Sequence, residues 1–100
     1  MSNDKYIKYV KTHVKARTLL EQFAEESAEG AKAALKLIRA AEMSENPTPT
    51  TLQEAMDNLK EEFFDIAICY YLFTSKLPSL EEIRGCDKWQ RWAKRLGCRE

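Results

Sequence analysis

Two pairs of acidic residues share one spacing and occupy positions where carboxylates are unexpected. Glu26 and Glu29 lie three residues apart in a segment with helical periodicity, about 60° apart around the helix axis, on a face that also carries Leu19. Glu62 and Asp65 repeat this spacing on a second segment of the same kind. Both pairs therefore border the apolar side of a predicted helix.

Carboxylates that meet near an apolar seam repel one another, and they cannot all stay ionised there without a cation. Zinc is not expected, because the chain has a single histidine and its three cysteines form no CxxC motif. Carboxylate oxygens suit Mg²⁺ or Mn²⁺, and Mg²⁺ keeps several waters and completes its coordination with substrate phosphate. The sequence thus predicts a metal site with four ligands, Glu26, Glu29, Glu62 and Asp65.

Two further pairs have the same spacings, but their positions favour solvated side chains. Glu42 and Glu45 adjoin a segment that contains two prolines. Glu54 and Asp57 lie in the opening turns of a predicted helix, where carboxylates interact favourably with the positive end of the helix dipole. We therefore expect neither pair to bind the metal.

Four helices are predicted to position these residues. Apolar and small residues recur with the 3.6-residue period over 16–43 and 51–75, and a shorter helix over 4–14 precedes them. A last helix is expected over 79–97, interrupted by Gly85. No segment shows the alternation of a strand, so the predicted fold is an all-α antiparallel bundle of three main helices plus a short N-terminal one, completed by oligomerisation.

Local signals mark the ends of these helices. Prolines at 47 and 49 end the first long helix, and Pro78 ends the second. Thr50 or Thr51 can cap the second long helix, with Glu54 in the capping-box position for a Thr51 cap, and Ser79 can cap the last helix with Glu82 in that position.

Composition limits the function classes. One hundred residues, 44% of them hydrophobic and 32% charged, fit a single domain over 1–100, and a net charge of zero gives no reason to expect nucleic acid or an anionic membrane as a partner. The longest apolar run, 66–73, is too short to span a membrane, and the N-terminus lacks the apolar region of a signal peptide. We expect a cytoplasmic protein with reduced cysteines that pack as small apolar residues.

The acidic pattern resembles that of a known enzyme family. Glu26-x-x-Glu29, followed after thirty-two residues by Glu62-x-x-Asp65, is similar to the ExxE…ExxD signature of the MazG-like all-α nucleoside triphosphate pyrophosphohydrolases. The strings EESAEGAKAALKLIRA, DNLKEEFFDIAI and KWQRWAKRL look like three blocks of small, often phage-encoded members and cover most of 16–96. Gly30 stands where those members commonly have leucine, and it permits close approach of a neighbouring helix or ligand.

The resemblance implies Mg²⁺-dependent cleavage of a nucleoside triphosphate between the α and β phosphates, in a homodimer or homotetramer. Glu29 or Glu62 is then the catalytic base, and the sequence does not separate base from ligand within the four carboxylates. The rival hypothesis is a non-catalytic helical assembly module derived from the same fold, in which the acidic pairs form interhelical salt bridges.

Cationic residues extend the predicted site. Lys36 lies seven residues after Glu29, on nearly the same helix face, and the resemblance points to Lys36 and Arg39 as phosphate contacts. Asn58 precedes Glu62 by one turn and is a candidate contact to a carboxylate or to substrate. The alternative for each of these residues is an ordinary charged or polar surface.

The last helix combines cations with tryptophan. Lys88, Arg91 and Arg95 flank Trp89 and Trp92, so they can close the site over a triphosphate while a tryptophan stacks on a base. Tryptophan at helical spacing is more often part of a core or a subunit interface, and we expect that role for at least one of the two.

Overall fold

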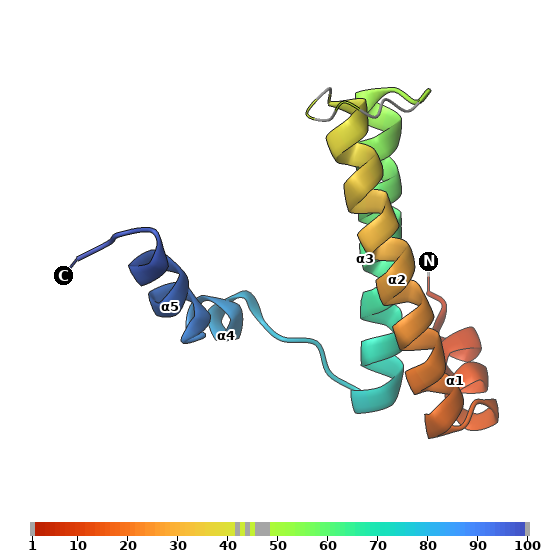
Figure 1. Cartoon of the computed structure of the whole chain (residues 1–100). Coiled ribbons are helices and arrows are strands. Elements are labelled where there is room, and N and C mark those ends of the chain that lie inside the picture. The colour runs from red at the N-terminus through yellow and green to blue at the C-terminus, as the bar shows by residue number, and fades with distance from the viewer. Residues whose placement is uncertain (1, 42, 44, 46–48, 100) are drawn as a thin grey trace.

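The computed structural model describes residues 2–41, 43, 45 and 49–99, and the regular structure in this part of the chain is entirely helical. The predicted all-α class is therefore confirmed. Five helices follow one another along the chain (Figure 1): α1 Asp4–His13, α2 Ala16–Ala40, α3 Leu52–Thr74, α4 Leu80–Arg84 and α5 Lys88–Arg95.

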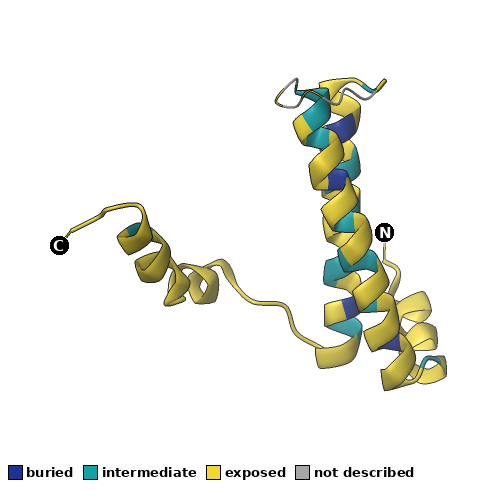
Figure 2. Cartoon of the chain, viewed as in Figure 1, coloured by how far each residue is buried: buried dark blue, intermediate teal, exposed yellow. Residues whose placement is uncertain are grey.

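The two long helices form an antiparallel hairpin (Figure 1), and of the described helices only α2 and α3 pack along their lengths. Figure 2 shows the few buried residues in the seam between them, namely Leu19, Ala33, Ala55 and Cys69. Small side chains such as alanine let two helix backbones approach closely. Gly30 does the same, since a Cβ at this position would lie 2.9 Å from Cδ1 of Ile66.

Both predicted caps are confirmed, although the Glu54 carboxylate accepts from the Thr51 hydroxyl and so does not close a capping box there. The Thr51 side chain accepts a hydrogen bond from the backbone N–H of Glu54 at 3.1 Å and starts α3. Ser79 and Glu82 form a complete capping box at the start of α4. At the other end of α3, Ser75 adopts a left-handed conformation with φ 63° and terminates the helix. The end of α2 at Ala40 precedes the expected end near residue 43, while Pro47 lies outside the described residues.

The C-terminal segment differs from the single interrupted helix that was expected. Gly85 ends α4 after five residues, and α5 begins three residues later. The indole N–H of Trp89 donates to the carbonyl oxygen of Ile83 at 2.7 Å and holds the two short helices together. We call 80–95 the C-terminal arm. It lies apart from the hairpin (Figure 1), so the third main helix does not pack in the seam of the single chain.

The first helix lies beside the lower end of the hairpin (Figure 1). Lys11 connects it to the end of α3, because its Nζ lies 4.6 Å from the ring centroid of Tyr71 and 3.5 Å from Oγ of Ser75. His13, the single histidine, stacks on Tyr9 with ring centroids 3.8 Å apart and serves this local contact. Within the described part of the chain, no helix combines the length and the apolar character that crossing a membrane requires.

Candidate metal centre

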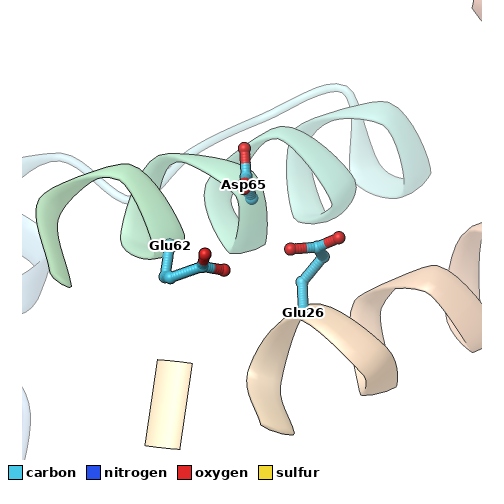
Figure 3. A group of neighbouring side chains, drawn as sticks. All are labelled: Glu26, Glu62 and Asp65. Atoms are coloured by element: carbon cyan, nitrogen blue, oxygen red, sulfur yellow. The ribbon is translucent and has the colours of Figure 1, made fainter. Parts of the chain in front are cut away.

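Three of the four predicted ligands converge at the middle of the hairpin. Glu26 extends from α2 towards Glu62 and Asp65 on α3 (Figure 3), and each residue offers a carboxylate oxygen within 4.8 Å of the other two. All three residues are half-buried. Their positions follow from the spacing noted in the sequence, because residues three apart share one helix face and both faces meet in the seam.

Glu29, the fourth predicted ligand, does not belong to this converging group. Its Oε1 lies 3.5 Å from Nζ of Lys32 on the same helix, and 52% of its side chain is exposed. Its charge nevertheless acts on the cluster, since it is one of the groups that raise the pKa of Glu62. The structure therefore places Glu29 near the acidic cluster but outside the group of three converging carboxylates.

The electrostatics of Glu62 reflect the crowding of carboxylates. Its pKa is raised above the ordinary glutamate value, first by burial, then by the negative charges of Asp65 and Glu26, and after them by Glu29 and Glu61. Proton uptake by Glu62 relieves this repulsion, and so does a bound cation.

The donor set fits a hard divalent cation. Three carboxylates within reach of one point offer oxygen ligands without nitrogen or sulfur, which suits Mg²⁺ or Mn²⁺. Among the described residues, the ion pairs join Arg17 to Glu21 and Lys32 to Glu29, so no lysine or arginine of this part neutralises the three converging carboxylates.

Gln22 is a neighbour of the cluster that the sequence reading missed. Its Nε2 donates to Oε1 of Glu26 at 2.9 Å and orients that carboxylate from one helical turn away. The signal for it was present, because a glutamine four residues before a predicted ligand faces the same side of the helix.

The alternative acidic pairs stay separate from this centre. Glu54 belongs to the N-terminal cap of α3, where its Oε1 accepts a hydrogen bond from the Thr51 hydroxyl at 2.9 Å. Asp57 accepts one from Gln53, also at 2.9 Å. Of the other pair, Glu42 lies outside the described residues.

The predicted substrate contacts fall into two groups. Lys36 and Asn58 lie on the hairpin, and helical geometry places them on the same side as Glu29 and Asp65, respectively. Arg39 is rotated about 80° further from α3 than Glu29 is. The other three cations, Lys88, Arg91 and Arg95, lie on α5 and are not brought to the acidic cluster in the single chain.

A hollow of about 320 Å³ adjoins the carboxylates where α1 meets the hairpin. Glu26 and Asp65 line it together with apolar side chains, including Val10, Leu19 and Ile68, and with Gln22 and Thr18 as polar groups. This hollow could not be predicted from the sequence, because nothing in the pattern of α1 indicates the surface against which the helix packs.

Cys69 lies in the wall of this hollow. Burial, followed by the charges of Glu26 and Asp65, raises the pKa of its thiol and keeps it protonated. The expectation that the cysteines pack as apolar residues is confirmed for Cys69 alone, since Cys86 and Cys98 are exposed.

In comparisons with known proteins, no family model, no curated protein and no solved structure matches the chain. The chemistry and arrangement of the residues themselves therefore carry the functional argument.

Proposed function

We propose that the protein is a Mg²⁺-dependent nucleoside triphosphate pyrophosphohydrolase. The convergence of Glu26, Glu62 and Asp65 from two helices supports this proposal most directly, because a bare group of carboxylates beside an open hollow suits a cation that carries a phosphorylated substrate. As part of this proposal we expect a cytoplasmic enzyme that works as a homodimer or homotetramer, with neither nucleic acid nor membrane as a partner.

The residues of the chain have separate tasks in this reaction. Bound Mg²⁺ would supply charge neutralisation for the triphosphate, and Glu26, Asp65 and Glu62 or Glu29 would hold it. The remaining glutamate of the last two accepts a proton from the water that attacks the α phosphorus, and pyrophosphate leaves with the electrons of the broken P–O bond. The raised pKa of Glu62 suits it to this role as a base.

Binding of the substrate involves both predicted groups of cations. Lys36 lies on the same side of the hairpin as the centre and is suited to bind the distal phosphates, while the hollow between α1 and the hairpin offers space for the nucleoside. Lys88, Arg91 and Arg95 take part only when the C-terminal arm of the same or another chain approaches the centre.

The decisive experiment measures pyrophosphate release from a panel of standard and modified nucleoside triphosphates, with Mg²⁺ and with EDTA. We expect metal-dependent turnover by the wild type and its loss in Glu62→Gln and Glu29→Gln, since each change removes a negative charge at nearly constant size. Glu54→Gln is the matched control on α3, and we expect it to keep nearly normal turnover. Normal turnover in both Glu62→Gln and Glu29→Gln would contradict the assignment of the site.

Thermal unfolding provides a readout that does not depend on turnover. A ligand at a hundred times its dissociation constant stabilises the native state by about 2.7 kcal/mol. We expect Mg²⁺ to raise the melting temperature of the wild type, and we expect smaller shifts in Glu62→Gln and Glu29→Gln. Equal shifts in the wild type and both variants would show that the metal binds elsewhere.

A non-catalytic assembly module is the second candidate. Large apolar side chains stay exposed on the hairpin, on the arm and directly after it, including Phe63 at 66%, Leu80 at 69% and Leu96 at 79%. Such surfaces are typical of a protein that packs against partners. Self-association without turnover of any triphosphate, with or without metal, would favour this candidate.

A further inference from the structure

The three converging carboxylates differ in what holds them in place. Of the three, Glu26 is the one that a described side chain holds by a hydrogen bond, because its Oε1 accepts from Nε2 of Gln22 at 2.9 Å. An ionised carboxylate can only accept, so the donating end of the Gln22 carboxamide must face it. Gln22 and Glu26 also line the same hollow, together with Asp65.

This hydrogen bond limits how Glu26 can meet a cation. Glu26 extends from α2 towards Glu62 and Asp65 on α3 (Figure 3). Its Oε1 is engaged by Gln22, which leaves Oε2 with both lone pairs free. A cation that takes one oxygen of Glu26 leaves the hydrogen bond intact. A cation that binds both oxygens of this carboxylate competes with Gln22 for one of them.

Divalent cations differ in which of these two modes they prefer. Mg²⁺ demands an octahedron of oxygens at about 2.0–2.1 Å, keeps several waters and is held by few carboxylates. Ca²⁺ takes about 6–8 oxygens at longer distances, and carboxylates often give it both of their oxygens. A glutamate with one oxygen already engaged therefore suits Mg²⁺ and supplies Ca²⁺ with one ligand fewer.

We infer that Gln22 is a positioning residue that makes the acidic cluster selective for Mg²⁺ over Ca²⁺. The inference rests on the proposed function, since it needs a divalent cation at Glu26, Glu62 and Asp65. Gln22 acts through Glu26 and does not itself bind the cation. Without this hydrogen bond the Glu26 carboxylate turns freely, so Mg²⁺ loses an oriented ligand while Ca²⁺ gains access to a second oxygen.

The chain contains a matched pair that separates positioning from helix stabilisation. Nε2 of Gln53 donates to Oδ1 of Asp57, also at 2.9 Å and also four residues apart, on α3. Pairs of this kind support any helix that carries them. Asp57 is not a member of the acidic cluster. Any effect of Gln22 that Gln53 does not share therefore comes from its position beside Glu26.

Isothermal titration calorimetry of the metal-free full chain, with Mg²⁺ and separately with Ca²⁺, tests the inference. Gln22→Met keeps the length of the side chain and suits a helix, but it cannot donate a hydrogen bond. We expect it to weaken Mg²⁺ binding about tenfold, as is typical when a partner of a metal ligand is removed. Ca²⁺ binding should change by less than about twofold, because the freed oxygen offsets the lost orientation.

Two further variants complete the design. Gln53→Met is the matched control, and we expect it to leave the affinities for both ions unchanged. Gln22→Ala also removes the donor and should shift the selectivity in the same direction as Gln22→Met. Gln22 is exposed, so neither change at this position removes packing from the seam, and far-UV circular dichroism checks that each variant stays helical.

The outcomes distinguish this inference from the catalytic proposal. Equal changes in Mg²⁺ and Ca²⁺ affinity in both Gln22 variants, or the same shift in Gln53→Met, would overturn the inference and leave the proposed function untouched. A wild type that binds neither ion would overturn both. A selectivity shift confined to the Gln22 variants supports the inference even if no triphosphate is turned over, and in that case the catalytic proposal alone is refuted.

Discussion

Gly30 is an unfavourable residue for the interior of a long helix, and the structure shows what it permits. Replacing glycine by alanine in a helix interior is worth about 1 kcal/mol of stability. At position 30 the new Cβ would lie 2.9 Å from Cδ1 of Ile66, so the isoleucine side chain must move. Leaving a favoured rotamer costs about 0.5–1.5 kcal/mol. We expect these effects to cancel, so that Gly30→Ala changes the free energy of unfolding by less than about 0.5 kcal/mol.

Removing the obstructing methyl group separates the two effects. Ile66→Val deletes Cδ1 and is expected to cost about 0.5–1.5 kcal/mol by itself. In that background the Cβ at position 30 finds free space, so Gly30→Ala should stabilise the hairpin by the full value of about 1 kcal/mol. The double-mutant cycle should therefore show a coupling of about 1 kcal/mol between positions 30 and 66.

Urea unfolding monitored by circular dichroism, at one fixed protein concentration, measures the free energy of unfolding of all four variants of the cycle. Ala28→Gly is the control in the same helix. Ala28 is exposed and points away from α3, so its loss should cost about 1 kcal/mol in both backgrounds. Additive effects of Gly30→Ala and Ile66→Val, within about 0.3 kcal/mol, would refute the role of close packing at Gly30.

Three further outcomes are expected. Because the pKa of Glu62 is raised in the folded state, the stability of the metal-free protein should fall as pH rises from about 4.5 through that pKa. Glu62→Gln should flatten this part of the stability curve, and an unchanged curve would contradict the cause assigned. Iodoacetamide should modify Cys86 well before Cys69, as followed by mass spectrometry, whereas equal rates would contradict the burial of Cys69. Thr51→Ala should lower the free energy of unfolding, measured in urea, by about 1 kcal/mol, because it removes the side-chain cap of α3. An unchanged free energy of unfolding would contradict a stabilising role of this cap.

The members of the acidic cluster could be predicted from the sequence where their positions depend on helix geometry alone. Residues three apart share a face, so the spacing of Glu62 and Asp65 and the apolar neighbours of Glu26 were sufficient to bring these three together. The contact of Glu29 with Lys32 depends on side-chain rotamers, which spacing does not determine.

The helix ends were similarly predictable, since the caps at Thr51 and Ser79 depend on residues at most three positions away. The place of the C-terminal arm was not predictable in this way. Pro78 and Gly85 mark where helices stop, but they contain no information on the surface against which Trp89 and its neighbours pack. That choice depends on contacts between segments far apart in the chain or on another chain.

The position of the tryptophans gives the C-terminal arm its own optical signal. Both tryptophans of the chain, Trp89 and Trp92, lie in α5, and the hairpin contains none. Excitation near 295 nm selects tryptophan, whereas far-UV circular dichroism is dominated by the two long helices. The same sample therefore shows, without any label, whether the arm and the hairpin unfold together or one before the other.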